Sequence, residues 1–223
     1  MKEVLEELKI YLSWLKEMGI NSVYLLPEQR KMLEKLSSKQ QLLQEIKIEL
    51  GDCKRCELWK TRHKIVFGEG PAEAKVVLVG EAPGHEEDLQ GKPFVGAAGE
   101  LLTKMLKAIG LSREEIYITN VVKCRPPHNR NPKLQEIEQC KPFLIRQLNI
   151  IKPSVICTLG SIATHTLLQK DIPISHLRGR VHLWQGIKLI PTFHPAYLLR
   201  NPGSKKLAWE DLKLLKKVLE KSI

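Results

Sequence analysis

The chain has 223 residues, of which 43% are hydrophobic and 27% charged, as in a globular protein with one sizeable domain. No apolar run reaches membrane-spanning length, and charges scattered through the first ten residues argue against a signal peptide. We therefore expect a cytoplasmic protein with no membrane partner, whose five cysteines are reduced thiols or metal ligands.

The net charge of +11 is unevenly distributed. Residues 1–50 hold eight basic and eight acidic residues, so the rest of the chain carries the whole excess. Residues 120–133 have four basic residues and no acid, and residues 172–209 have six basic residues and no acid. A lysine-rich surface is one interpretation, but acid-free stretches in turn-rich segments favour a polyanion, and nucleic acid is the leading partner.

Two helical stretches are predicted near the N-terminus. Leucines recur at helical spacing in residues 2–18, and a second series of apolar residues runs from 33 to 46. We interpret residues 1–40 as a helical N-terminal extension that packs on the domain or on a protein partner. Residues 41–223 form the main domain.

From residue 75 onwards, short β-branched segments alternate with helical stretches. The predicted strands are residues 75–80, 116–122, 154–160 and 187–193, and the helices are 98–110, 133–151, a stretch ending at 168, and 205–221. This alternation predicts an α/β fold with a central, mostly parallel four-stranded sheet flanked by helices. Residues 180–184 are a candidate for an additional edge strand.

Unusual residues follow the predicted strands. The segment "GEAPG" (80–84) follows the first strand, Asn120 closes the second and His194 follows the fourth. Ligands of parallel sheets bind beyond the carboxyl ends of the strands, so we expect the three loops to converge on one pocket. Taken singly, each residue also has a structural interpretation, as a solvated charge, a turn residue or a structural histidine. Because "GEAPG" matches neither the dinucleotide fingerprint nor a P-loop, a nucleotide cofactor is disfavoured.

The cysteines allow three kinds of site. Cys53 and Cys56 form a close pair in "CKRC", Cys124 and Cys140 are dispersed, and Cys157 lies in a strand as a small core hydrophobe. A redox dithiol is disfavoured because "CKRC" does not open a helix after a strand. One close pair with two dispersed thiols fits structural zinc and a four-iron cluster about equally.

Four segments resemble motifs of the family 4 uracil-DNA glycosylases, the iron–sulfur branch of the uracil-glycosylase superfamily. They are "CKRCELWKTRHKIVFGEG", "VLVGEAPGHEEDLQGKPFVGAAGELL", "YITNVVKCRPPHNRNP" and "PTFHPAYLLRNP". They occur in the family's order and spacing, and the resemblance runs from about residue 40 to the C-terminus. It implies an enzyme that flips uracil out of single- or double-stranded DNA and hydrolyses its N-glycosidic bond, which starts base excision repair.

The resemblance also implies a cofactor. Cys53, Cys56, Cys124 and Cys140 would ligate a structural [4Fe–4S] cluster that holds the loops near the DNA. Cys157 would not be a ligand.

The residues implied to bind uracil are Glu81, Ala82, Pro83, Glu87, Phe94, Asn120 and His194. Phe94 would stack on the flipped base, and Asn120 would pair with its edge and exclude cytosine. His194 would stabilise the negative charge on the departing uracil. Glu81 and Asn129 would help to place the attacking water, which makes Glu81, Asn129 and His194 the expected catalytic residues. Glu87 would be a wall against the methyl group of thymine.

The segment "HPAYLLRNP" resembles the superfamily's intercalation loop. Leu198, Leu199 or Arg200 would fill the gap left by the flipped nucleotide, while Arg125 and Arg130 would hold phosphates. Two alternatives stay open: a family 5-like glycosylase of broader base range, and a non-catalytic iron–sulfur DNA-binding accessory protein. The first is disfavoured because the family 5 loop tends to contain Asp and Ala where this chain has "GEAPG".

Overall fold

A computed structural model describes residues 2–20 and 38–221, and its side chains from residue 10 onwards within those ranges. The chain divides into two compact units, Met1–Leu42 and Leu43–Ile223. The first contains α1 (Lys2–Glu17), which confirms the first predicted helix. Of the second predicted helix, residues 33–37 lie outside the described residues, and the remainder belongs to α3 (Lys39–Leu50). None of the described helices is long and apolar enough to cross a membrane.

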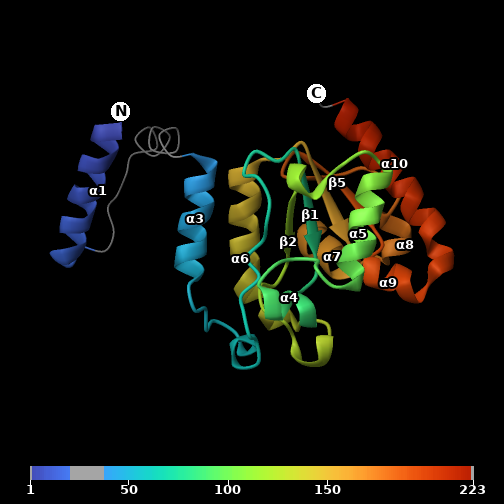
Figure 1. The fold of residues 1–223 in the computed structure, drawn as a ribbon, viewed down its shortest axis with the longest axis horizontal. Coiled ribbons are helices and arrows are strands. Elements are labelled where there is room, and N and C mark those ends of the chain that lie inside the picture. Colours follow the sequence, from blue (N-terminus) through green and yellow to red (C-terminus); the bar gives the residue numbers. More distant parts are fainter. Residues whose placement is uncertain (1, 21–37, 222–223) are drawn as a thin grey trace. The chain divides into compact units, whose positions relative to one another are not determined.

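The second unit is built around a sheet of five strands (Figure 1). They are β1 (Val76–Gly80), β2 (Tyr117–Asn120), β3 (Val155–Leu159), β4 (His182–Trp184) and β5 (Ile187–Thr192). The spatial order is β2-β1-β3-β5-β4, in which β2, β1, β3 and β5 are parallel. The predicted α/β fold is confirmed, but the predicted count of four strands is one too small.

The additional strand is β4, which pairs antiparallel with the outer side of β5. Gln185 and Gly186 connect the two strands, with φ angles of 48° and 84°. Two successive positive φ angles are typical of the tight hairpin turn that matches the twist of its strands. The segment proposed as an edge strand therefore does form one.

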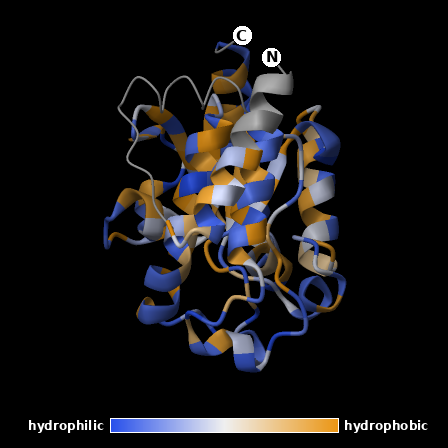
Figure 2. Cartoon of the chain, turned by 90° about the vertical axis from the view of Figure 1, so that its left-hand side faces the viewer, coloured by the Kyte–Doolittle hydropathy of each residue, from blue (hydrophilic) through white to orange (hydrophobic). Residues whose placement is uncertain are grey.

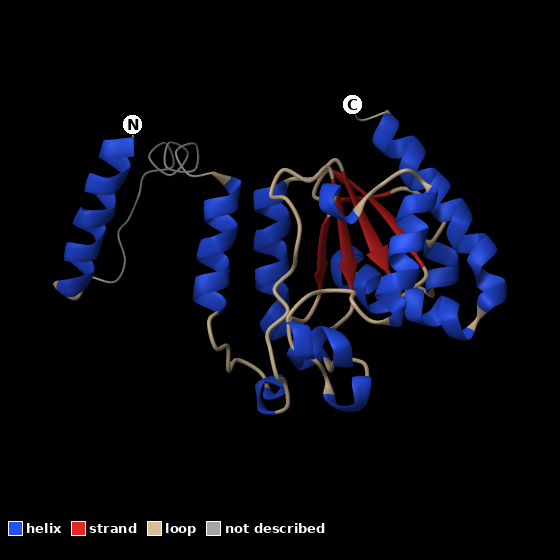
Figure 3. Ribbon diagram, viewed as in Figure 1, coloured by secondary structure: helices blue, strands red, loops and turns tan. Residues whose placement is uncertain are grey.

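Helices cover both faces of the central sheet (Figure 3). The helices that follow β1 along the chain are α4 (His85–Gln90), α5 (Ala97–Ala108), α6 (Leu134–Ile151), α7 (Ser161–Leu168), α8 (Ile174–Leu177), α9 (Pro195–Arg200) and α10 (Lys205–Glu220). Short 3₁₀ turns occur at η1 (Glu57–Lys60), η2 (Arg113–Glu115), η3 (Pro127–Asn129) and η4 (Pro202–Ser204). Hydrophobic and hydrophilic residues are interleaved along the helices (Figure 2), as expected when one face of a helix is buried.

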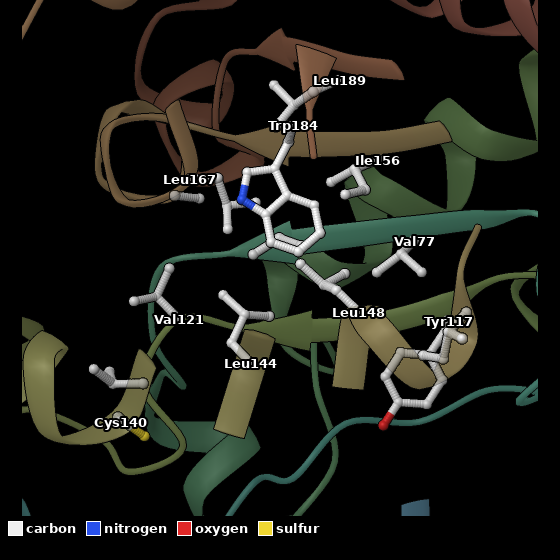
Figure 4. Close-up of a cluster of buried hydrophobic side chains, with 14 of the residues drawn as sticks. Val77, Tyr117, Val121, Cys140, Leu144, Leu148, Ile156, Leu167, Trp184 and Leu189 are labelled. Atoms are coloured by element: carbon white, nitrogen blue, oxygen red, sulfur yellow. The ribbon is translucent and has the colours of Figure 1, made fainter. Parts of the chain in front are cut away.

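The strand β1 shows why both faces of the sheet are apolar. Val77 and Val79 belong to a core cluster that contains residues of α6 and α7, together with Trp184 (Figure 4). Val76 and Leu78 belong to the opposite cluster, with residues of α5 and α10. Side chains alternate along a strand, so a strand buried on both faces must be apolar throughout.

Cys157 lies in the cluster beneath α5 and α10 and is only 1% exposed. Its predicted place in the core is confirmed.

Candidate active site

The carboxyl ends of the parallel strands surround a cavity of about 810 Å³. Of the predicted site residues, those that line it are Glu81, Ala82, Pro83, Glu87, Phe94, Asn120, Asn129, Arg130, His194 and Arg200. The three loops expected to converge therefore do so. Gly160 and Ser161, after β3, also line the cavity and were missed. Their position at the end of the third predicted strand was the sequence signal for them. Because β3 lies between β1 and β5, the residues that follow it reach the same cavity.

Asn120 is the last residue of β2, and its side chain has an unsatisfied oxygen. The residue is 1% exposed, and its Oδ1 has no hydrogen-bond partner among the described residues. A buried polar atom without a partner costs about 1–3 kcal/mol of stability. A ligand that brings an N–H group into the cavity can satisfy this oxygen.

Phe94 lies against Asn120 because Gly80 has no side chain. A Cβ on Gly80 would lie 2.3 Å from Asn120 Oδ1 and 2.6 Å from Phe94 Cζ. No real Cβ approaches other atoms so closely, so any other residue at position 80 would displace one of these side chains. The first glycine of "GEAPG" therefore leaves room for the side chains of Phe94 and Asn120 beside β1.

His194 precedes α9 and caps its first turn. Its Nδ1 accepts a hydrogen bond from the Ala196 backbone N–H at 3.1 Å. A ring nitrogen that accepts carries no proton, so Nε2 carries the proton of the neutral ring. Burial lowers the pKa of His194 to about 4; the positive charge of Arg200 also lowers it, and Glu87 opposes the shift. The ring is therefore a neutral hydrogen-bond donor at physiological pH, and its centroid lies 5.5 Å from that of Phe94.

Glu81 is the half-buried carboxylate of the cavity. Burial raises its pKa to about 7, so its protonated and ionised forms are both populated near neutral pH. A carboxylate with such a pKa is well suited to accept a proton from water.

Replacing Glu81 with glutamine should raise the free energy of unfolding at pH 8 by about 1 kcal/mol, after a discount for partial solvent contact. The pKa of Glu81 rises from 4.5 to about 7 on folding, so the folded state favours the protonated form. The stabilisation is complete below pH 4.5 and is lost as the pH rises through 7. Chemical denaturation at pH 4.5 and pH 8 measures the difference. The exposed Glu138→Gln is the control, and a Glu81→Gln effect equal at both pH values would contradict the prediction.

The carboxylate of Glu87 is fully engaged by backbone N–H groups. Its Oε1 accepts from Val95 at 2.8 Å and from Gly96 at 2.9 Å, and its Oε2 accepts from Gly84 at 3.1 Å. Glu87 thus ties the segment after β1 to the segment that enters α5. Its predicted role as a wall against the thymine methyl group stays a prediction.

Asn129 lines the cavity and is hydrogen-bonded to Arg125, which does not line it. Arg125 Nε donates to Asn129 Oδ1 at 2.7 Å, and Arg125 Nη1 lies 3.0 Å from His85 Nδ1. Arg125 thereby links the loop after β2 to the first turn of α4. The predicted role of Asn129 in placing water stays a prediction; its amide nitrogen and the second lone pair of its oxygen are the groups that could bond a water.

Arg130 is paired within the protein. Its guanidinium donates to both oxygens of Glu136, at 2.9 Å and 2.7 Å. Since Glu136 is only 4% exposed, this ion pair neutralises much of the charge that Arg130 would offer to a phosphate.

The structure corrects the intercalation prediction at Leu198. This side chain is 1% exposed and packs with Phe193 and Ala208, so it cannot enter DNA without leaving the core. Leu199 is 44% exposed, and Arg200 is exposed and lines the cavity. The reason is helical phase: in α9, successive side chains point about 100° apart, so neighbours of a buried residue point outward.

The structure also corrects the interpretation of one basic residue in the acid-free stretch 120–133. Lys123 is 0% exposed. Its Nζ donates to Thr119 Oγ1 at 2.6 Å, to the Asn120 carbonyl at 2.8 Å and to Gln147 Oε1 at 2.7 Å. Lys123 is therefore an internal cation that holds the end of β2, and it is not available to a phosphate.

Cys53, Cys56, Cys124 and Cys140 come from three separate segments; in addition to burial, nearby cysteines contribute to the raised pKa of Cys56, Cys124 and Cys140. Burial raises the pKa of the Cys124 thiol to about 12, and burial also raises that of Cys140. Among the described residues, however, no three His, Cys, Asp or Glu side chains are grouped as ligands of a metal ion.

Donors surround these sulfurs. Arg55 Nη1 lies 3.2 Å from Cys53 Sγ, and Arg62 Nη1 lies 3.4 Å from Cys124 Sγ. The backbone N–H of Lys123 donates to Cys140 Sγ at 3.3 Å. Cations and N–H groups directed at sulfur stabilise thiolates, so the donor set fits a thiolate-ligated group.

Residues 67–213 match the family model described as the Uracil DNA glycosylase superfamily. The chain belongs to this superfamily.

Curated relatives show which branch of the superfamily this chain resembles. A Type-4 uracil-DNA glycosylase of Sulfurisphaera tokodaii is 46% identical over 79% of this chain and 84% of the relative. A Type-4 uracil-DNA glycosylase of Thermotoga maritima is 43% identical over 82% of this chain and 98% of the relative. A Type-5 uracil-DNA glycosylase of Pyrobaculum aerophilum is 30% identical over 67% of this chain. The predicted resemblance to the type-4 branch is confirmed.

Proposed function

We propose that this protein excises uracil from DNA and so starts base excision repair, the activity that the names of its type-4 relatives state. The observation that carries the proposal is the unsatisfied Oδ1 of Asn120 in a cavity that also holds Phe94 and the neutral His194. DNA, single- or double-stranded, is the partner, and the uracil must leave the base stack to enter the cavity.

Base recognition rests on Asn120. Uracil presents a donor at N3 next to an acceptor at O4, whereas cytosine presents an acceptor at N3 and a donor at N4. The Oδ1 of Asn120 accepts from N3–H of uracil, and its amide nitrogen donates to O4. Cytosine would place an acceptor against Oδ1, which would leave two buried oxygen or nitrogen atoms unsatisfied. The Phe94 ring supplies the stacking surface for the base.

Bond cleavage rests on His194 and Glu81. As the C1′–N1 bond breaks, its electron pair passes to the uracil and negative charge develops on O2. The Nε2–H of His194 donates to O2, and this interaction strengthens as the charge grows. A water oxygen bonds to C1′, and Glu81 accepts the proton that this water releases. The uracil leaves as an anion and takes up a proton from solvent, and Glu81 returns its proton to solvent, so the products are uracil and an abasic site.

The DNA would be held at the rim of the cavity. Leu199 and Arg200 are exposed residues of α9, the helix that follows His194, and either can fill the gap left by the flipped nucleotide. Arg125, which is bonded to the cavity residues Asn129 and His85, would contact a phosphate.

We also propose that Cys53, Cys56, Cys124 and Cys140 hold a [4Fe–4S] cluster. When bound, the cluster supplies cross-links between chain segments rather than redox chemistry. These thiols come from the segment after α3, the loop after β2 and α6, so their shared group fastens the loop that carries Arg125 and Asn129. We propose a cytoplasmic location as well, because thiols stay reduced there and can serve as ligands.

The Cys124→Ser protein should lose the yellow-brown colour and become less stable. Parent protein should contain about four irons and four sulfides per chain. Visible absorbance, metal analysis and thermal unfolding measure the three quantities. Cys157→Ser, which alters a core cysteine outside the set, should keep its colour. Colourless parent protein with stoichiometric zinc would show that the cofactor assignment is wrong.

One experiment tests the activity. The protein is incubated with a labelled oligonucleotide containing a single uracil, and alkali then cleaves the DNA at any abasic site. Strand breaks at the uracil position, together with free uracil, are expected. Binding without base release would instead favour a non-catalytic DNA-binding module. Matched oligonucleotides containing other deaminated bases test for the broader range of a family 5-like enzyme.

A further inference from the structure

Phe94 has a backbone conformation that is rare for its residue type. Its φ angle is 52°, in the left-handed region, and the residue is 6% exposed. A bulky residue adopts this region only where its surroundings hold it there. The conformation is therefore maintained by neighbours, and these neighbours can be identified.

Arg113 is the principal one. From the start of η2, its Nη1 donates to the Phe94 carbonyl at 2.9 Å and its Nη2 donates to the Pro93 carbonyl at 2.8 Å. A single planar guanidinium thus holds two consecutive carbonyl groups, which fixes the direction of the backbone on the N-terminal side of α5. Arg113 itself does not line the cavity.

Close packing completes this arrangement. A Cβ on Gly99 would lie 1.9 Å from the Phe94 carbonyl oxygen, so the first turn of α5 abuts that carbonyl directly. On the other side, the Phe94 ring lies between Gly80 and His194. The backbone and the ring of Phe94 are both confined, and only Arg113 among these neighbours offers charged donors to the strained segment.

We propose that Arg113 is a positioning residue that pre-forms the stacking surface of the uracil pocket. It holds the left-handed backbone of Phe94, and therefore the ring, in place before DNA arrives. A base that enters a surface already ordered loses less binding free energy to the ordering of side chains. The inference rests on the proposed function, since stacking of uracil on Phe94 is part of it.

A double-mutant cycle tests the proposal. Single-turnover excision of uracil is measured for parent protein, Arg113→Met, Phe94→Ala and the double variant. Methionine keeps an unbranched apolar chain like the stem of arginine and removes the donors. We expect Arg113→Met to slow excision about tenfold. In the Phe94→Ala background the same change should slow excision less than twofold, because no ring remains to be positioned.

Two controls separate positioning from general stability. Arg146→Met removes an exposed arginine of α6 that is paired with Glu49 at 2.5 Å and does not line the cavity. This change should leave the excision rate unchanged. Visible absorbance and thermal unfolding establish that each variant is folded. If Arg113→Met does not fold, Arg113→Lys takes its place in the cycle; it keeps the charge and loses the rigid planar fork that holds the two carbonyls.

The outcomes are distinct. An Arg113 effect confined to the parent background supports the proposal. An equal loss in both backgrounds, or an Arg113 variant within twofold of the parent rate, overturns it. Failure of the parent protein to release uracil would instead refute the proposed function, which is measured in the same assay before any variant is compared.

Discussion

The His194→Ala protein should excise uracil about a hundredfold or more slowly than the parent in single-turnover experiments, the scale for loss of one oxyanion donor. The affinity for DNA should change little, because the Nε2–H of His194 donates most strongly when charge develops on the leaving base. His165→Ala is the matched control, since that ring is bonded to the Ile172 carbonyl and does not line the cavity. A folded His194→Ala protein with the parent rate would show that His194 does not stabilise the leaving uracil.

The pH dependence of the His194 contribution has a defined direction. The pKa of the half-buried ring is about 4, below its ordinary value of 6.5. The neutral ring therefore stabilises the folded state above pH 6.5, and this stabilisation is lost as the pH falls through 4. The His194 ring should stay neutral during excision until the pH falls to about 4. The excision rate should instead rise as the pH increases through 7, because Glu81 ionises there and can then accept a proton from water.

The Asn120→Asp protein should show the second large effect, a preference for uracil over cytosine reduced by about a thousandfold. A buried aspartate is held protonated by desolvation, and its O–H and C=O groups can present the pattern that cytosine requires. Single-turnover rates on matched oligonucleotides with uracil or cytosine at one position measure the preference. Asn149→Asp makes the same chemical change on an exposed position of α6. An unchanged preference in Asn120→Asp would show that another group reads the base.

The sequence allowed the convergence of the loops to be predicted because it depends only on topology. Parallel strands end at one edge of their sheet, so Glu81, Asn120 and His194 had to meet once the strands were assigned correctly. The β4 strand was harder to predict, because its three residues are too few to show an alternating pattern.

Other features depend on contacts that no local pattern encodes. Leu198 lies in a six-residue helix, which is too short for its apolar periodicity to reveal the buried side. Glu87 binds N–H groups eight and nine residues away, and these partners are brought to it only by the folded turn into α5. Lys123 contradicts the usual expectation for lysine, because it is buried with three oxygen partners from β2 and α6.

The buried ammonium group of Lys123 restricts how the sequence can drift in evolution. Thr119 and Gln147 supply two of its three oxygens, and a buried donor left without its acceptor costs about 1–3 kcal/mol. Because a domain is stable by only about 5–15 kcal/mol, such single changes would be selected against. Positions 119, 123 and 147 should therefore covary among homologous sequences, for example through joint replacement by apolar residues. This covariation should occur even though none of the three side chains lines the cavity.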